Sequence, residues 1–208
     1  MARQKFTTPA GILTFPCFID EPDTSYADEN NDNDLGDFKA RMRLDPNDAA
    51  AAEFLAFLQS AYDTNLEEHK VKLNKSKLKQ KDEGRPWMNE QDEEGNDTGM
   101  ILIRTKLTRR VMKRDGSYFE QSPKVFDLEG KPLSEAPRIG PGTKAKIAGE
   151  IHGWYNAGLG VGITLWCNAV QVEEFVEKFH ASNKGAADYG FAVQKFDDVE
   201  FLNSKSVV

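Results

Sequence analysis

The chain has 208 residues, enough for one sizeable domain with a tail or with long insertions. Charged residues make up 29% of it, and no apolar run approaches the roughly 18–20 residues that span a bilayer. The N-terminus lacks an apolar stretch of signal-peptide type, so we expect a cytoplasmic protein.

The net charge of −7 argues at first against a nucleic-acid partner. The two signs are separated along the chain, however. Residues 20–37 and 90–97 hold only acidic charges, whereas cations alternate over 39–43 and crowd 104–114. Local potential governs where a polyanion binds. The alternative, that these charges are ordinary solvated surface, stays open at this point.

Residues 11–19, rich in β-formers, predict a first strand, and Pro16 within it indicates an edge or a bulge. The acidic stretch 20–36 has too few apolar residues to pack and is expected to be a loop. Residues 37–44, DFKARMRL, alternate strictly between apolar and basic side chains. This pattern predicts a half-buried strand with a cationic outer face.

A helix is expected from Asp45-Pro46 onward, with Asp45 as its cap and Asp48 complementing the helix dipole. Its apolar stripe at helical spacing is more typical of core packing than of a ligand site. The stripe consists of Phe54, Leu55, Leu58, Ala61 and Tyr62. Trp87 then stands in a polar stretch that we expect to be a loop.

Four further strands are predicted, at 99–111, 124–128, 143–155 and 159–172, with a hairpin turn at Asp115-Gly116. The order favours a mainly β fold, an OB-fold-like small antiparallel barrel with one long helix and extended loops. In the usual OB-fold the helix lies between strands three and four, whereas here it follows strand two.

No nucleophile-elbow, phosphate-loop or zinc-protease motif is present, so no catalytic residue, metal or cofactor is expected. The glycine-rich run 158–162 leads into a strand rather than a helix, which argues against a dinucleotide site. Cys17 and Cys167 each sit in an apolar strand-like run without metal-ligand neighbours. We expect two buried free thiols.

Binding residues are predicted on the last pair of strands. One face of 143–155 carries Lys144, Lys146, His152 and Trp154 together with Glu150. Cations contact phosphates and aromatic rings stack on bases, so this face can hold single-stranded nucleic acid. Trp154 could instead be a core residue. The pair Tyr118 and Phe119 could form a clamp beside the basic run, or could pack back on the core.

Several stretches resemble the single-stranded DNA-binding proteins of T7-type bacteriophages. They are FTTPAGILTFP, FKARMRLDPNDAAAAEFLAFL, KVFDLEGKPL and PRIGPGTKAKIAGEIHGWYNAGLGVGITLWCNAVQV, and together they span most of 6–175. The resemblance implies an OB-fold and sequence-independent binding of single-stranded DNA in phage replication, recombination and repair. It also implies the cytoplasm of an infected bacterium, a possible homodimer, and a C-terminal tail that recruits replication proteins such as polymerase and helicase-primase.

We therefore expect residues 1–178 to form an OB-fold DNA-binding domain and 179–208 a tail. The expected DNA-binding residues are Lys39, Arg41, Arg43, Arg104, Lys106, Arg109, Arg110, Tyr118, Phe119, Lys144, Lys146 and Trp154. The expected partner-binding residues of the tail are Phe196, Asp197, Asp198, Glu200 and Phe201. Three alternatives stay open: a single-stranded RNA-binding protein, an acidic DNA-mimic or scaffold protein, and a metal-dependent nuclease.

Overall fold

The computed structural model describes residues 4–28, 30–76, 84–133 and 138–178. The expected tail with its five partner-binding residues lies outside them. The elements are β1 (Gln4–Thr7), β2 (Gly11–Asp23), β3 (Asp37–Leu44), α1 (Ala49–Ser76), β4 (Trp87–Gln91), β5 (Asp97–Thr108), β6 (Arg110–Met112), β7 (Tyr118–Glu120), β8 (Lys124–Phe126), β9 (Lys144–Asn156) and β10 (Gly160–Glu174). No helix in the described ranges is long and apolar enough to cross a membrane.

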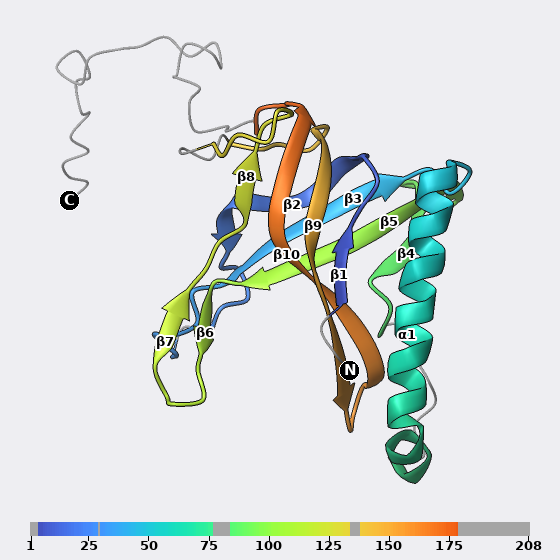
Figure 1. Ribbon diagram of the computed structural model, residues 1–208, viewed down its shortest axis with the longest axis vertical. Coiled ribbons are helices and arrows are strands. Elements are labelled where there is room, and N and C mark those ends of the chain that lie inside the picture. The colour runs from blue at the N-terminus through green and yellow to red at the C-terminus, as the bar shows by residue number, and fades with distance from the viewer. Residues whose placement is uncertain (1–3, 29, 77–83, 134–137, 179–208) are drawn as a thin grey trace, which may run out of the picture. The chain divides into compact units, whose positions relative to one another are not determined.

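Five strands form a circuit around the core. The pairing runs from β2 through β3, β5 and β10 to β9, and β9 pairs again with the start of β2. β5 and β10 run parallel, and the other neighbours in the circuit run antiparallel. A five-stranded, partly open barrel of this kind is the OB-fold arrangement. The expected fold class is therefore confirmed (Figure 1).

The alternation in 37–44 produces β3 as predicted. Phe38, Ala40, Met42 and Leu44 are buried, and the side chains between them are half-buried on the outer face. The pairing of β2 with β3 shifts register between Thr14 and Cys17, so Pro16 lies at a bulge, one of the two outcomes expected for it.

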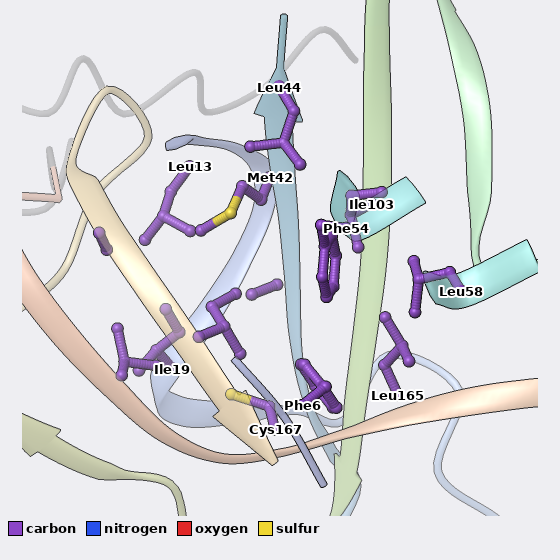
Figure 2. Packing of buried hydrophobic residues seen from close by; sticks show 14 of the residues in the cluster. Phe6, Leu13, Ile19, Met42, Leu44, Phe54, Leu58, Ile103, Leu165 and Cys167 are labelled. Carbon is purple, nitrogen blue, oxygen red and sulfur yellow. The ribbon is translucent and has the colours of Figure 1, made fainter. Parts of the chain in front are cut away.

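The core lies inside the circuit and is closed at one side by α1. Figure 2 shows Phe54 of α1 beside Ile103 and Leu58 of α1 beside Leu165, and all four belong with Met42 to one buried cluster. Full burial of such a side chain stabilises the fold by about 1.5–3 kcal/mol. The apolar stripe of the helix is thus core packing, as the sequence indicates.

The helix begins later than expected. Asp48 Oδ1 accepts a hydrogen bond from the backbone N–H of Ala51 at 3.0 Å, so Asp48 is the cap. Asp45, the predicted cap, instead accepts from the N–H of Asn47 at 2.9 Å and forms a separate turn. The prediction was wrong because two aspartates three residues apart both suit a cap.

Trp87 also differs from its prediction. It is the first residue of β4, pairs with Ile103 of β5, and packs edge-on against Tyr62 with ring centroids 6.1 Å apart. The acidic loop begins only after Asp23, since β2 extends to that residue. The short strand β1 was not anticipated.

A two-stranded ribbon of β6 and β7 stands outside the main sheet. Its turn contains Gly116 with φ of 84°, as the Asp-Gly pair predicts. In Figure 1 the ribbon and α1 lie on opposite sides of the barrel. The ribbon is held at its base, where the N–H of Gln121 donates to the carbonyl oxygen of Arg109 at 2.8 Å.

Candidate nucleic-acid interface

The outward side chains of three neighbouring strands form one continuous face. In the register, Arg41 of β3 lies beside Arg104 of β5, and Lys39 lies beside Lys106. Lys106 in turn lies beside Trp166 of β10. Partners in register point to the same side of a sheet. The alternation of three strands therefore places cations and an aromatic ring on the same outer surface.

A hollow of about 400 Å³ opens on this face, and we call it the arginine groove. Its lining combines cations from three segments with one indole ring. The lining residues are Pro16, Lys39, Ala40, Arg41, Arg85, Pro86, Arg104, Thr105, Lys106, Trp154, Ile163 and Thr164. Five of the expected DNA-binding residues thus meet in one place.

Gly162 leaves space for the indole of Trp154. Gly162 pairs with Trp154 across the β9–β10 hairpin. A Cβ at Gly162 would meet Cζ2 of Trp154 at 2.2 Å and the Cα of Gly84 at 2.7 Å. The ring therefore lies flat over a position without a side chain, close to the 84–86 segment. It is half-buried and borders the groove.

Arg41 and Arg104 bring two like charges side by side at the centre of the groove. Burial, and then the charge of Arg41, lower the pKa of Arg104 below its usual value. Among the described residues neither has a carboxylate partner, and the Nε of Arg41 has no hydrogen-bond partner. Arg104 donates from Nη2 to the carbonyl oxygen of Arg85 at 2.8 Å. Two adjacent cations without local carboxylates attract an anion.

Arg85 adds a third guanidinium to the lining. Its Cζ lies 5.1 Å from the ring centroid of Tyr62 and 5.8 Å from that of Trp87. Guanidinium groups stack on aromatic faces and keep their positive charge in that arrangement. The backbone N–H of Arg104 donates to the carbonyl oxygen of Pro86 at 2.7 Å, which fixes this segment against β5.

The two lysines of the groove have carboxylate partners. Lys39 Nζ lies 2.9 Å from Asp23, and Lys106 Nζ lies 2.9 Å from Asp37. Hydrogen bonds from Ser25 and then from Lys39 lower the pKa of Asp23 to about 2. Both acids flank the loop that links β2 to β3, so this loop partly neutralises the groove.

A second hollow of about 760 Å³ lies between the β6–β7 ribbon and the outer face of β10, and we call it the ribbon groove. Cations, two aromatic rings and one carboxylate line it. The lining residues are Leu107, Thr108, Arg110, Val111, Met112, Lys113, Arg114, Phe119, Gln121, Ser122, Lys124, Glu150, Trp166 and Asn168. Arg110 and Phe119 are the expected DNA-binding residues found here.

The other expected DNA-binding residues lie outside both linings. Arg43 donates to Glu90 Oε1 from Nε at 2.8 Å and from Nη2 at 2.6 Å. Lys144 and Lys146 both pair with Glu173, Lys146 at 3.0 Å. Carboxylates therefore compete with any phosphate at these positions.

The remaining two residues are Arg109, which directly precedes β6, and Tyr118, which begins β7. Arg109 pairs with Glu120, 3.2 Å away, and borders a separate hollow beside Glu21. Tyr118 is 44% exposed on the ribbon. Of the two alternatives for this ring, an exposed clamp or packing on the core, the structure thus shows the exposed position.

Sequence reasoning assigned no role to Arg85 or to Trp166. Arg85 comes from a segment whose position depends on β4 pairing with β5, and Trp87 was the only local sign of that strand. Trp166 shares its face with Thr164 and Asn168, and its alternation with buried Leu165 and Cys167 could have marked it as outward.

The described residues include no group of three His, Cys, Asp or Glu side chains placed to hold a metal ion. Cys17 and Cys167 are free and buried, as the sequence predicts. Burial raises the pKa of Cys17 to about 11 and that of Cys167 to about 12. Neither thiol is activated as a nucleophile.

The fold and the groove define an OB-type barrel whose second and third barrel strands, β3 and β5, present an electropositive face. No protein-family model matches the chain, and no curated protein does. Its fold is nevertheless similar to that of gp2.5, a single-stranded DNA-binding protein encoded by bacteriophage T7. That crystal structure gives a TM-score of 0.64 at 19% identity, covering 100% of each chain.

The single-stranded DNA-binding protein from bacteriophage Enc34 is also similar, with a TM-score of 0.57 at 13% identity over 90% of each chain. The same protein in complex with single-stranded DNA gives 0.58 at 14% identity, over 85% of this chain and 89% of that one. At these identities the likeness shows the fold. The resemblance seen in the sequence is thus confirmed at the level of the fold.

Proposed function

We propose that this chain binds single-stranded DNA without reading its sequence and serves phage DNA replication, recombination and repair. The arginine groove is the observation that carries the proposal. It places Arg41, Arg104 and Trp154 together on an acidic protein. Phosphates bind cations and every base has a face that can stack, so this combination holds a strand of any sequence.

The residues have distinct roles in this proposal. Arg41 and Arg104 contact phosphates directly, Arg85 adds its positive charge to the same groove, and Trp154 stacks on a base. Lys39 and Lys106 contact phosphate after releasing Asp23 and Asp37. The expected residues outside the arginine groove contribute less, because nearby carboxylates already neutralise most of their cations. They are Arg43, Arg109, Arg110, Lys144 and Lys146, with Tyr118 and Phe119 as exposed rings on the ribbon.

The fold likeness supports the same function. Proteins of the same fold are single-stranded DNA-binding proteins, and one of them is known in complex with single-stranded DNA. We propose no catalytic activity, because the described part of the chain has no group of His, Cys, Asp or Glu side chains placed to hold a metal ion.

Fluorescence anisotropy of labelled oligo(dT) tests the proposal directly. We expect binding that quenches tryptophan emission and weakens as salt rises. The log–log slope of affinity against salt should be about −0.7 for each neutralised phosphate. Binding without salt dependence, or no binding at all, would refute the proposal.

Matched ligands separate the alternatives in the same assay. An RNA-binding protein would prefer oligo(U) to oligo(dT), and a nuclease would shorten labelled DNA in the presence of magnesium. A DNA-mimic would ignore oligonucleotides and bind a basic protein. In the mimic, Asp23 and Asp37 would face the partner, whereas in the structure both pair with lysines of the groove.

We further propose that the tail recruits replication proteins in the cytoplasm of an infected bacterium, with the chain acting as a monomer or homodimer. The tail variant Asp197→Asn/Asp198→Asn should lower affinity for a replication polymerase or helicase-primase in a pull-down, and should leave oligo(dT) binding unchanged. Sedimentation at several concentrations would establish the oligomeric state.

A further inference from the structure

Two aromatic rings are stacked on the outer face of the barrel, beside the arginine groove. His152 of β9 and Trp166 of β10 have ring centroids 4.6 Å apart and planes inclined by 11°. His152 is exposed, whereas Trp166 is half-buried and lines the ribbon groove. The contact with His152 holds the indole in one orientation, which lowers the entropy lost when a further ring stacks on it.

The ribbon supplies positive charge opposite these rings. Lys113 and Arg114 are exposed at its turn, and Lys113 Nζ lies 5.9 Å from the ring centroid of Phe119. Lys124 of β8 is exposed and lines the same hollow. Among the described lining residues, Glu150 is the one carboxylate. Cations around a fixed aromatic ring form the combination that binds a nucleotide.

The two grooves adjoin each other. Lys106 lines the arginine groove and pairs in register with Trp166, which lines the ribbon groove. Trp166 lies four residues along β10 from Gly162, the partner of Trp154. A strand rises about 3.3 Å per residue, so the two tryptophan positions are about 13 Å apart along the sheet.

We propose that the ribbon groove is a second subsite for the same DNA strand, with a base stacked on Trp166 and the neighbouring phosphates on Lys113 and Arg114. This inference rests on the proposed function. A strand leaving Trp154 passes Lys106, crosses β10 and continues under the β6–β7 ribbon. Phe119 and Arg110 then border its far side.

Tryptophan fluorescence of the full chain tests the subsite, with anisotropy of labelled oligo(dT) confirming that DNA is bound. Trp87 is half-buried, packs edge-on against Tyr62 and lines neither groove, so it is not expected to report on DNA. The variant Trp154→Phe therefore reports through Trp166. We expect it to keep a DNA-dependent quench, and we expect Trp154→Phe/Trp166→Phe to lose that quench while still binding DNA. A Trp154→Phe variant that binds DNA without any quench would overturn the inference.

Affinity gives a second readout. Trp166→Ala should weaken the binding of long oligo(dT) by about 5- to 150-fold, the effect of losing one stacked base. Circular dichroism and thermal melting show whether that variant is folded, and Trp166→Phe serves if it is not. Unchanged affinity in folded Trp166→Ala would contradict the second subsite.

Salt dependence tests the cations. Lys113→Gln and Arg114→Gln should each make the log–log salt slope shallower by about 0.7. Lys131→Gln is the matched control, because Lys131 pairs with Glu129 in a turn outside both grooves. Equal slopes for all three variants would overturn the inference. If the wild-type chain binds no oligo(dT), the proposed function fails first, so the two failures are distinguishable.

Discussion

The side-chain amide of Asn65 donates a hydrogen bond to the carbonyl oxygen of Gly162 at 2.9 Å. A second bond runs from the same Nδ2 to the carbonyl oxygen of Trp154 at 3.2 Å. Asn65 is fully buried, and a Cβ at Gly153 would meet its Oδ1 at 2.4 Å. One residue of α1 thus fixes the hairpin segment that carries Trp154, although the helix itself contributes no side chain to the arginine groove.

We expect Asn65→Ala to lower both stability and DNA affinity. Two buried carbonyl oxygens would lose their donor, which costs about 1–3 kcal/mol of unfolding free energy. The hairpin would also hold Trp154 less firmly. Urea unfolding and oligo(dT) titration measure the two effects. Gln59→Ala is the control: it removes only the hydrogen bond to Asp63 on the same helix, so it should lower stability by about 0.2–0.5 kcal/mol and leave DNA affinity unchanged.

Gly162→Ala should displace the indole of Trp154. The new methyl group would lie 2.2 Å from the present position of Cζ2, and overpacking of this kind typically costs about 1–3 kcal/mol. We expect a shift of tryptophan emission and weaker oligo(dT) binding. At Gly158 a Cβ would meet only Asn156 Oδ1, at 3.4 Å. Gly158→Ala should therefore resemble the wild type. If Gly162→Ala had no larger effect than Gly158→Ala, the indole of Trp154 would tolerate the added methyl group.

Much of the barrel follows from local patterns in the sequence. The alternation in DFKARMRL determines which side chains of β3 face outward, and Asp115-Gly116 marks the turn of the ribbon. These features depend on residues adjacent in the chain, where periodicity and turn chemistry act directly. The same patterns place Arg41 and Arg104 on outer faces, although their proximity comes from the register of β3 with β5.

The charge partners could not be predicted in the same way. Glu90 reaches Arg43 only because β4 pairs with β5, and Glu173 reaches Lys146 only through the register of β10 with β9. Each contact joins side chains on different strands. A run of cations in the sequence therefore shows where positive charge lies, but it does not show which of these cations form an ion pair with a carboxylate.

The two cysteines give a prediction about pH. Burial raises the pKa of Cys17 from 9.0 to about 11, and that of Cys167 from 9.0 to about 12. The folded state thus holds both thiols neutral at pH values where the unfolded chain ionises them. The resulting stability is fully present below pH 9 and is lost as the pH rises through 11 and 12.

Thiol titration with a chromogenic disulfide reagent checks the burial of the two cysteines. At neutral pH we expect both thiols to react slowly in the native protein and rapidly in guanidinium chloride. Urea unfolding at rising pH should show the alkaline loss of stability. Fast reaction of either thiol in the native state would show that it is exposed.

Arg41 and Arg43 lie two residues apart on the same face of β3, yet we expect opposite consequences when each is replaced. Arg41→Gln removes a charge that opposes Arg104, so stability should stay unchanged or rise by a few tenths of a kcal/mol, about the effect of separating like charges across two strands. Oligo(dT) affinity should fall, and the salt slope should become shallower by about 0.7.

Arg43→Gln should instead lower stability and leave DNA affinity nearly unchanged. It leaves Glu90, which is only 9% exposed, without the guanidinium that donates to it twice. An unpaired carboxylate of this kind costs about 1–3 kcal/mol of unfolding free energy. Thermal melting and oligo(dT) anisotropy on both variants separate the two roles. We expect the smaller effect on DNA affinity from Arg43, because a charge paired with Glu90 attracts phosphate less strongly than the charge of Arg41. If both arginines affected DNA affinity equally, the phosphates would instead lie along the whole of β3.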